Sequence, residues 1–182
     1  MTAANVFFEL SLFLSAFLCT LVFGKMLVFQ TVVMPGISNL NDREYLRAFQ
    51  VIDGVIQKNE PVFVSVWIGS VVSLLVTTVS CIALDIKYGD SGGVSLDGST
   101  DMALLVLSTI AWLIGNYTTF TINVPLNNRV KVLDLIEMDA AELTFERRHF
   151  ESKWIKWHKF RVVLFGTVSL ILLALLMVTD EL

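Results

Sequence analysis

Long apolar stretches alternate with short polar ones along this chain, and the apolar stretches have the length of membrane-spanning helices. A helix that crosses the hydrocarbon core of a bilayer needs about 20 mostly apolar residues. Four stretches meet this requirement: residues 6–34, 61–86, 102–124 and 160–178. We therefore predict an all-α, integral membrane four-helix bundle in which residues 1–182 form a single membrane domain. The first stretch lacks the basic leader and short core of a cleavable signal peptide, so we expect it to be retained.

The polar segments between these stretches differ in pattern. Residues 37–60 contain apolar side chains that recur near the helical period, which predicts a short interfacial helix in the first loop. Residues 87–101 are rich in glycine and serine, which favours a solvated turn, and their aspartates do not have the spacing of a calcium loop. Residues 126–153 form a charged connector. Within it, Asp139 can cap an amphipathic helix that leads into the fourth span.

Three prolines are expected to shape the ends of the spans. Proline disfavours the helical conformation in the residue before it and glycine permits a turn, so residues 34–36 (MPG) are predicted to end the first span. Pro125 lacks a backbone donor and is predicted to kink or end the third span. Pro61 opens the second span, where its missing N–H costs little.

Composition supports a membrane protein and argues against some functions. Of the 182 residues, 55% are hydrophobic and 16% are charged, against about 25% charged in soluble domains. No basic patch is interleaved with aromatic residues as in nucleic-acid-binding proteins, so we expect no nucleic-acid partner. Cys19 and Cys81 lie inside apolar runs, which favours small packing residues over a disulfide.

The basic residues are concentrated in two of the three loops. Nearly all of the 13 lysines and arginines lie in the first and third loops and their flanks. Since cytosolic loops carry an excess of lysine and arginine, we predict that these two loops are cytosolic and that both termini are non-cytosolic. The polar motifs at the ends of the spans then meet at one depth, the cytosolic rim of the bundle.

Four polar residues along the third span form a stripe, because they are spaced by three, four and four: Asn116, Thr119, Asn123 and Asn127. Residues at these spacings share one face of a helix. Two interpretations stay open. The amides either hydrogen-bond neighbouring helices and hold the bundle together, or they line a polar pocket at the end of the helix.

A second shared face lies at the entry to the fourth span, at positions i, i+3, i+4 and i+7: Trp154, Trp157, His158 and Arg161. An aromatic belt with basic interfacial anchors is one interpretation. In the other, His158, which titrates near neutral pH, is a general acid or base. Arg161 then either holds an anionic oxygen or extends to the lipid headgroups.

The sequence offers little that would hold a metal or an organic cofactor. The two histidines, His149 and His158, have no second ligand at metal spacing. No glycine-rich phosphate loop, nucleotide fingerprint or C-x-x-C motif is present. We therefore expect no metal and no bound cofactor. We also find no internal repeat and expect no broken helix within the membrane, which argues against a transporter.

Taken together, the MPG motif, Pro61, the NVPLN segment (123–127) and the W-x-x-W-H-x-x-R segment (154–161) resemble the anthrone oxygenase-like family of small four-helix integral membrane proteins. The resemblance implies that this chain is similar to proteins of which a few fungal members take part in oxidising anthrones to anthraquinones, without an obvious bound cofactor. The positions that match the motif are Pro35, Asn123, Pro125, Asn127, Trp154, His158 and Arg161.

Two functions follow as hypotheses. In the first, the protein oxidises an apolar aromatic substrate without a cofactor: His158 is the base, Asn123 and Arg161 stabilise the enolate oxygen, and four residues bind the substrate, namely Asn116, Asn127, Trp154 and Trp157. In the second, it is a non-catalytic accessory subunit or ligand-binding protein of a larger membrane complex. Membrane lipid is the expected partner in both, with an apolar small molecule in the first and a homo-oligomer or larger complex in the second.

Overall fold

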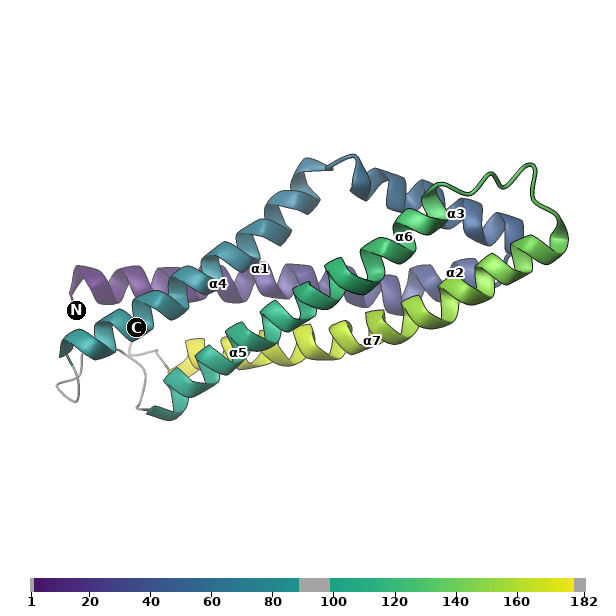
Figure 1. The fold of residues 1–182 in the computed structure, drawn as a ribbon. Helices are drawn as coiled ribbons and strands as arrows, with labels where there is room; N and C mark the ends of the chain where they lie inside the picture. The colour runs from purple at the N-terminus through teal and green to yellow at the C-terminus, as the bar shows by residue number, and fades with distance from the viewer. Residues whose placement is uncertain (1, 89–98, 179–182) are drawn as a thin grey trace. The chain divides into compact units, whose positions relative to one another are not determined.

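The computed structural model of the chain describes residues 2–88 and 99–178, and all regular structure within them is helical (Figure 1). Residues 89–98, which make up most of the predicted solvated turn, lie outside the described residues. The helices follow one another in this order: α1 (Ala3–Val28), η1 (Phe29–Val33), α2 (Met34–Ser38), α3 (Asp42–Gln57), α4 (Pro61–Tyr88), α5 (Ser99–Thr118), η3 (Thr119–Asn123), α6 (Val124–Lys131) and α7 (Ala140–Val178).

Four continuous helical segments are long and apolar enough to cross a membrane: Ala3–Ser38, Pro61–Lys87, Ser99–Lys131 and Ala140–Val178. The predicted all-α class with four spans is confirmed, and the chain is a multi-pass membrane protein. Large apolar side chains face outward on these segments, including Phe13 and Leu170, which are 61% and 70% exposed. Such outward faces suit contact with lipid, because hydrocarbon surrounds a spanning helix on every side that protein does not cover.

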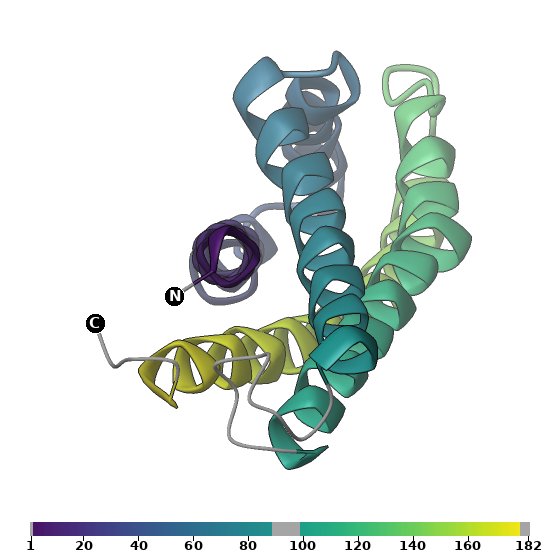
Figure 2. The same ribbon diagram turned by 90° about the vertical axis from the view of Figure 1, so that its left-hand side faces the viewer.

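The prediction that the MPG motif ends the first span is wrong, because the helix continues to Ser38. Figure 2 views this first helix nearly along its axis. The turn before Pro35 is a π turn, in which the Met34 N–H donates to the Phe29 carbonyl five residues back. A π turn carries one residue more than an α turn. It displaces the carbonyl that the proline ring would otherwise meet.

The third span repeats this arrangement, so of the two outcomes predicted for Pro125, a kink or the end of the span, the end is excluded. The turn before Pro125 is the π segment η3, in which the Val124 N–H donates to the Thr119 carbonyl. The helix then continues as α6 to Lys131. Both spans remain continuous helical segments through their π turns.

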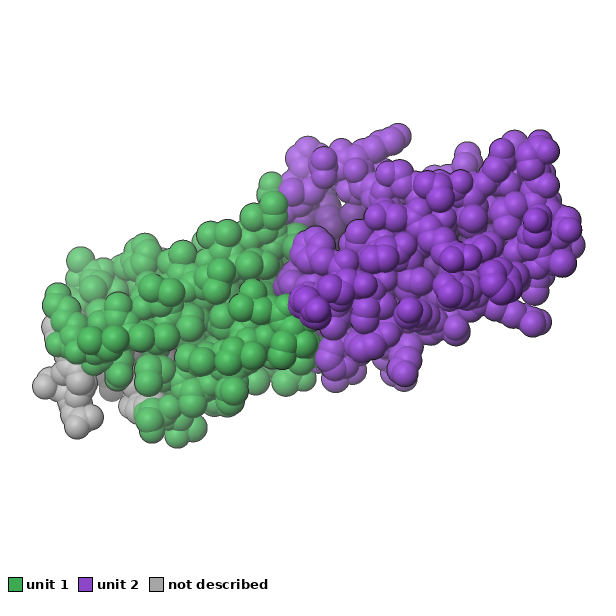
Figure 3. Space-filling model, in the orientation of Figure 1, with its two compact units in different colours: residues 1–23, 65–114, 164–182 green, residues 24–64, 115–163 purple. Residues whose placement is uncertain are grey.

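The described chain divides into two compact units, which are coloured separately in Figure 3. Unit 1 comprises residues 1–23, 65–114 and 164–182, and unit 2 comprises residues 24–64 and 115–163.

Hydroxyl side chains hold the helices of unit 1 together. The Ser15 and Thr77 hydroxyls lie 2.9 Å apart, and those of Thr78 and Thr109 lie 2.6 Å apart. Small hydroxyl residues let helices approach closely and bond across their interface, where hydrocarbon offers no competing water.

Tight packing of rings and small residues completes the core of unit 1. The Trp112 and Phe165 rings have centroids 4.0 Å apart. A Cβ atom at Gly166 would lie 2.9 Å from the Phe23 ring, so glycine permits this close approach. Cys19 and Cys81 are buried free thiols, as predicted.

Unit 2 has one apolar core, to which α2, α3, α6, the connector before α7 and the first part of α7 contribute. The predicted helix in the first loop is confirmed as α3, and its N-cap Asn41 accepts from the Glu44 N–H at 3.0 Å. Aromatic residues dominate the contact: the Phe49 ring lies 4.4 Å from Phe150 and 5.6 Å from Trp154. The core consists of Met34, Tyr45, Leu46, Phe49, Leu126, Val130, Leu135, Leu143, Phe150 and Trp154.

The predicted amphipathic helix before the fourth span is the first part of α7, which continues into that span without interruption. Asp139 caps it as expected. Its carboxylate accepts from the Glu142 N–H at 2.8 Å, and the Glu142 carboxylate accepts from the Asp139 N–H at 2.8 Å. This reciprocal pair is a capping box, which satisfies two backbone donors at once.

Arg147 ties α7 to the turn between α2 and α3. Its guanidinium donates to the carbonyls of Ser38 and Leu40, both at 2.8 Å, and it forms ion pairs with Asp42 at 3.1 Å and Glu151 at 3.0 Å. These bonds satisfy the carbonyl groups that the end of α2 leaves without an intrahelical partner.

We expect Arg147→Lys to destabilise unit 2, because an ammonium cannot reproduce the fork of donors that reaches two carbonyls and two carboxylates. The two carbonyls are exposed, so water can replace part of these bonds, and we expect a loss of about 1 kcal/mol. Thermal unfolding of the purified protein in detergent measures the effect. The neighbouring Arg148 is exposed, so Arg148→Lys is the matched control, and an equal shift of Tm in both variants would contradict the assigned role.

Candidate functional site

Unit 2 brings most of the predicted site residues into one place. Trp154, His158 and Arg161 lie on α7, and all three are buried, with 4%, 3% and 4% exposure. Asn123, the last residue of η3, is 2% exposed. Polar groups buried to this degree inside spanning helices are costly and are retained for a reason.

His158 is held at both ring nitrogens. Its Nε2 lies 3.0 Å from the Met26 carbonyl oxygen of α1, and its Nδ1 lies 3.1 Å from Nη2 of Arg161. A guanidinium can only donate, so Nδ1 accepts and the ring proton sits on Nε2. The imidazole is therefore neutral and fixed in one tautomer. We call Met26, Thr119, Trp154, His158 and Arg161 the His158 cluster.

Aromatic rings enclose the imidazole. The Trp154 indole stacks on it with centroids 4.4 Å apart and planes 12° apart. Phe29 of η1 lies 6.3 Å from the His158 ring and 6.4 Å from the Trp154 ring. A flat apolar surface thus adjoins the polar atoms of the cluster.

Arg161 is a buried cation whose partners are neutral. Its Nη1 donates to the Thr119 hydroxyl at 2.8 Å and its Nη2 to His158, while its Nε has no hydrogen-bond partner among the described residues. Within residues 2–88 and 99–178, no carboxylate forms an ion pair with it. A buried charge is expensive unless it is paired. The guanidinium can therefore receive an oxygen that carries negative charge.

One π segment contributes a member of the cluster, and the other contributes a ring that packs against the cluster. Thr119 opens η3 and Phe29 opens η1. Each segment also holds a buried amide oxygen without a partner among the described residues, Oε1 of Gln30 and Oδ1 of Asn123. Gln30 was not predicted. The signal that could have found it is its own polarity, because Gln30 stands inside the first apolar stretch.

Asn127 connects Trp154 to a buried acid on α3. The Trp154 indole N–H donates to the Asn127 carbonyl oxygen at 2.8 Å, and the Asn127 amide donates to the Asp53 carboxylate at 2.8 Å. Burial raises the pKa of Asp53, while hydrogen bonds from Gln57 and Asn127 pull it back down. Both ends of the Asn127 amide are thus engaged with protein groups that fix the position of the indole.

Asp53 was not predicted from the sequence, although a signal was present. It stands four residues after Phe49, so it belongs to the apolar face of α3, where an acid is out of place. It is 6% exposed.

The other two predicted residues have different surroundings. The Trp157 ring packs against Phe160 with centroids 5.8 Å apart, and Phe160 is 42% exposed. Asn116 lies on α5 and is 7% exposed. It precedes Thr119, the first residue of η3, by about one turn. Among the described residues, no three His, Cys, Asp or Glu side chains group in a way that could hold a metal ion.

We expect Arg161→Met to leave the free energy of unfolding unchanged or to raise it by about 1 kcal/mol, because replacing a buried charge by an apolar side chain removes its desolvation cost. Residues kept at the expense of stability are typical of functional sites. Chemical unfolding in detergent measures it, and Arg148→Met on the exposed face of α7 is the control. A loss of stability as large as that from Arg147→Lys would make Arg161 a structural residue.

Comparison with known proteins gives one family. A family model described as anthrone oxygenase matches residues 61–171, more than half of the chain. The match includes the NVPLN segment and all of the α7 residues of the His158 cluster. Comparison with curated proteins and with solved structures gave no match.

Proposed function

We propose, since this chain belongs to the anthrone oxygenase family, that it oxidises an apolar aromatic ketone of the anthrone class with dioxygen at the His158 cluster. The substrate would reach the cluster from the bilayer, in which flat apolar molecules dissolve. The reaction would be the conversion of the CH₂ carbon opposite the ketone into a second carbonyl.

The observation that carries this proposal is the buried Arg161 guanidinium with no carboxylate partner among the described residues. An anthrone loses a proton from its CH₂ carbon to give an enolate, whose negative charge lies largely on oxygen. A preorganised cation in a site of low dielectric stabilises such a charge more strongly than water does. The unpaired Nε of Arg161 is a donor available to that oxygen.

The base would be His158, released by an exchange of partners. Its Nδ1 lone pair accepts from Arg161. When the substrate oxygen takes that Arg161 N–H, the lone pair becomes free to remove the proton. The Met26 carbonyl, which accepts from Nε2–H, stabilises the imidazolium that forms.

The atoms of the reaction balance with dioxygen as the oxidant. The base takes one proton from the CH₂ carbon, and the enolate gives its electrons to dioxygen with formation of a C–O bond. The peroxide takes up the proton from the imidazolium. The second C–H proton then leaves as the O–O bond breaks, so that one water departs and the carbon becomes a carbonyl. Each turnover consumes one dioxygen and one anthrone.

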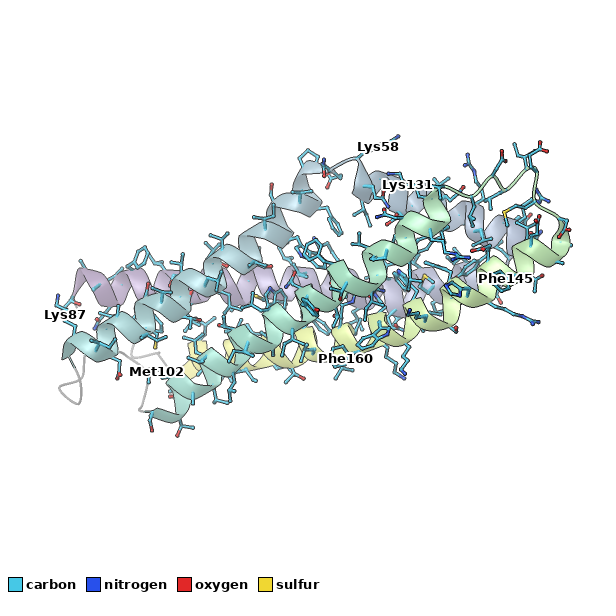
Figure 4. The ribbon with its side chains drawn as sticks, viewed as in Figure 1. Lys58, Lys87, Met102, Lys131, Phe145 and Phe160 are labelled. Atoms are coloured by element: carbon cyan, nitrogen blue, oxygen red, sulfur yellow. The ribbon has the colours of Figure 1, made fainter. Side chains whose placement is uncertain are left out.

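The distribution of basic residues among the loops supports an orientation of the protein in the membrane. The first and third loops carry most of the lysines and arginines, among them Lys58 and Lys131 (Figure 4). Both loops belong to unit 2. By the positive-inside rule, we place them and the His158 cluster toward the cytosol, with both termini on the other side.

A second candidate is a non-catalytic ligand-binding or accessory subunit of a larger membrane complex. The pairing of Asn127 with Trp154 and Asp53 favours it, because these polar groups satisfy one another as structural side chains do. Arg161 does not fit this pattern, because it has no carboxylate partner among the described residues and its Nε has no hydrogen-bond partner there. The enzyme is therefore the better-supported candidate.

We expect His158→Phe to lower kcat/KM for anthrone oxidation by about 10²–10⁴, since it removes the base but keeps a ring against Trp154. We expect Arg161→Met to lower it by about 10²–10³. Oxygen consumption and the absorbance of the quinone, measured in lipid nanodiscs, report the rate after subtraction of the spontaneous reaction in protein-free discs.

The matched controls are His149→Phe and Arg148→Met, which change the same residue types on the exposed part of α7. Both should oxidise anthrone at the parent rate. Folded His158→Phe protein that turns over as fast as the parent would overturn the assignment of the base, and a parent protein without activity above the empty discs would favour the second candidate.

The orientation in the membrane is tested with variants that each carry one added cysteine. Cys19 and Cys81 are buried and should give little background labelling. A membrane-impermeant maleimide should label Glu137→Cys from the cytosolic side and Ser99→Cys from the opposite side, because these exposed positions lie in the third loop and at the end of the second. Labelling of both from one side would contradict the four-span arrangement.

A further inference from the structure

The outward face of α7 changes character at one point along the helix. From Phe160 onward its exposed side chains are mainly apolar, and Phe160 and Val163 are 42% and 63% exposed. Before Phe160 the exposed side chains include three lysines, Lys153, Lys156 and Lys159. Apolar side chains suit the hydrocarbon of a bilayer, and exposed charges are costly there. The hydrocarbon boundary on this face of α7 therefore lies at about Phe160.

The three lysines lie at the depth of the lipid headgroups. Lys159, Lys156 and Lys153 precede Phe160 by one, four and seven residues, which corresponds to about 1.5, 6 and 10 Å along a helix. The headgroup layer on each side of a bilayer is about 5–8 Å thick. Lys156 and Lys159 therefore lie within this layer, and the long side chain of Lys153 can reach it. The Trp157 ring, which packs against Phe160, lies at the same depth, where tryptophan is enriched in membrane proteins.

The charge of these lysines is not neutralised by ion pairs within the protein. All ion pairs of the described residues use an arginine, either Arg129 or Arg147. Residues 152–163, the part of α7 that includes the three lysines, contain no aspartate or glutamate. The acid directly before this stretch, Glu151, pairs with Arg147. The outward face of α7 thus carries a local positive charge at the depth where the phosphates of a bilayer lie.

We propose that Lys153, Lys156 and Lys159 form a binding surface for anionic phospholipids, with Trp157 beside them at the membrane interface. The lysine ammonium groups donate to the phosphate oxygens, and the acyl chains lie along the apolar face that begins at Phe160. A lysine near a membrane surface strengthens the binding of anionic lipid by about fivefold. In the orientation proposed above, this surface faces the cytosolic leaflet, which carries the anionic lipids. It uses the exposed face of α7, whereas the His158 cluster uses the buried face, so the inference does not depend on the proposed oxidation.

The test incubates the full-length protein in detergent with equal amounts of phosphatidylglycerol and phosphatidylcholine that have the same acyl chains. Mass spectrometry of the lipids extracted from the repurified protein gives the ratio in which the two are retained. We expect the parent protein to prefer phosphatidylglycerol by about tenfold or more. The preference should fall as the salt concentration rises, because salt screens exposed charges. The double variant Lys156→Gln/Lys159→Gln should reduce the preference by about tenfold.

The matched control is the double variant Lys131→Gln/Arg148→Gln, which removes the same charge from two exposed positions of unit 2. Arg148 precedes Phe160 by twelve residues, which corresponds to about 18 Å along the helix and lies beyond the headgroup layer. This variant should prefer phosphatidylglycerol as strongly as the parent does. A second control adds inorganic phosphate during the incubation at the concentration of the lipid. It should not displace the lipid, because the acyl chains also contribute to binding.

Four results would overturn the inference. Equal retention of the two lipids by the parent protein would do so, and would leave the lysines as a surface for an acidic protein. A preference in the parent that high salt leaves unchanged would do so without the use of any variant. So would a preference that the two double variants reduce equally or that the lysine variant leaves unchanged, since this surface would then not set it. Displacement of the lipid by inorganic phosphate would show a site for free anions instead.

The supporting result is a preference for phosphatidylglycerol that the lysine variant loses and the control variant keeps. This result would hold for a protein that oxidises no anthrone, because lipid retention is measured without substrate. Conversely, a protein that oxidises anthrone and retains both lipids equally would contradict this inference and leave the proposed function intact.

Discussion

A guanidinium buried within a spanning helix must donate its hydrogen bonds to the few polar groups around it, and at Arg161 this requirement fixes the geometry of the His158 cluster. Its bond to Thr119 joins α7 to η3 directly. Its bond to Nδ1 of His158 fixes the tautomer of the imidazole, which turns the Nε2 proton toward the Met26 carbonyl of α1. One cation thus connects α7 to both of the helices that contain π segments.

The π segments themselves follow from proline in an apolar environment. A proline that ended the helix within the hydrocarbon would expose backbone groups that nothing there can satisfy. The π turns before Pro35 and Pro125 keep the helix continuous, because the residue before each proline bonds five residues back. The rule that proline ends helices misled the prediction at Pro35, while at Pro125, where a kink or an end was predicted, only the end is excluded.

Much of the fold could be predicted from the sequence, because it depends on local signals. Length and apolar composition predicted the four spans, and Asp139 as a helix cap predicted the start of α7. The site was predicted in part. On a helix His158 and Trp157 lie roughly 100° apart around the axis although both are near Trp154, so the narrow buried face of α7 includes His158 and leaves Trp157 against Phe160. Which side of Trp154 would be buried depends on the neighbouring helices, which spacing alone does not reveal.

For two amides of the third span, Asn127 and Asn123, the structure shows which atoms bond to protein groups. Polar groups that serve only to join helices are expected to satisfy one another. Asn127 does so between Trp154 and Asp53, on the side of α3. Asn123 uses its donor and leaves its acceptor unpaired, and Gln30 and Arg161 each keep one unpaired atom among the described residues. The satisfied groups hold the Trp154 indole in place, while the groups with an unpaired atom belong to the two π segments and to the middle of α7. An arrangement that is rigid on one side and unpaired on the other is what a ligand site requires, because the ligand can then complete the bonds without deforming the groups that receive it.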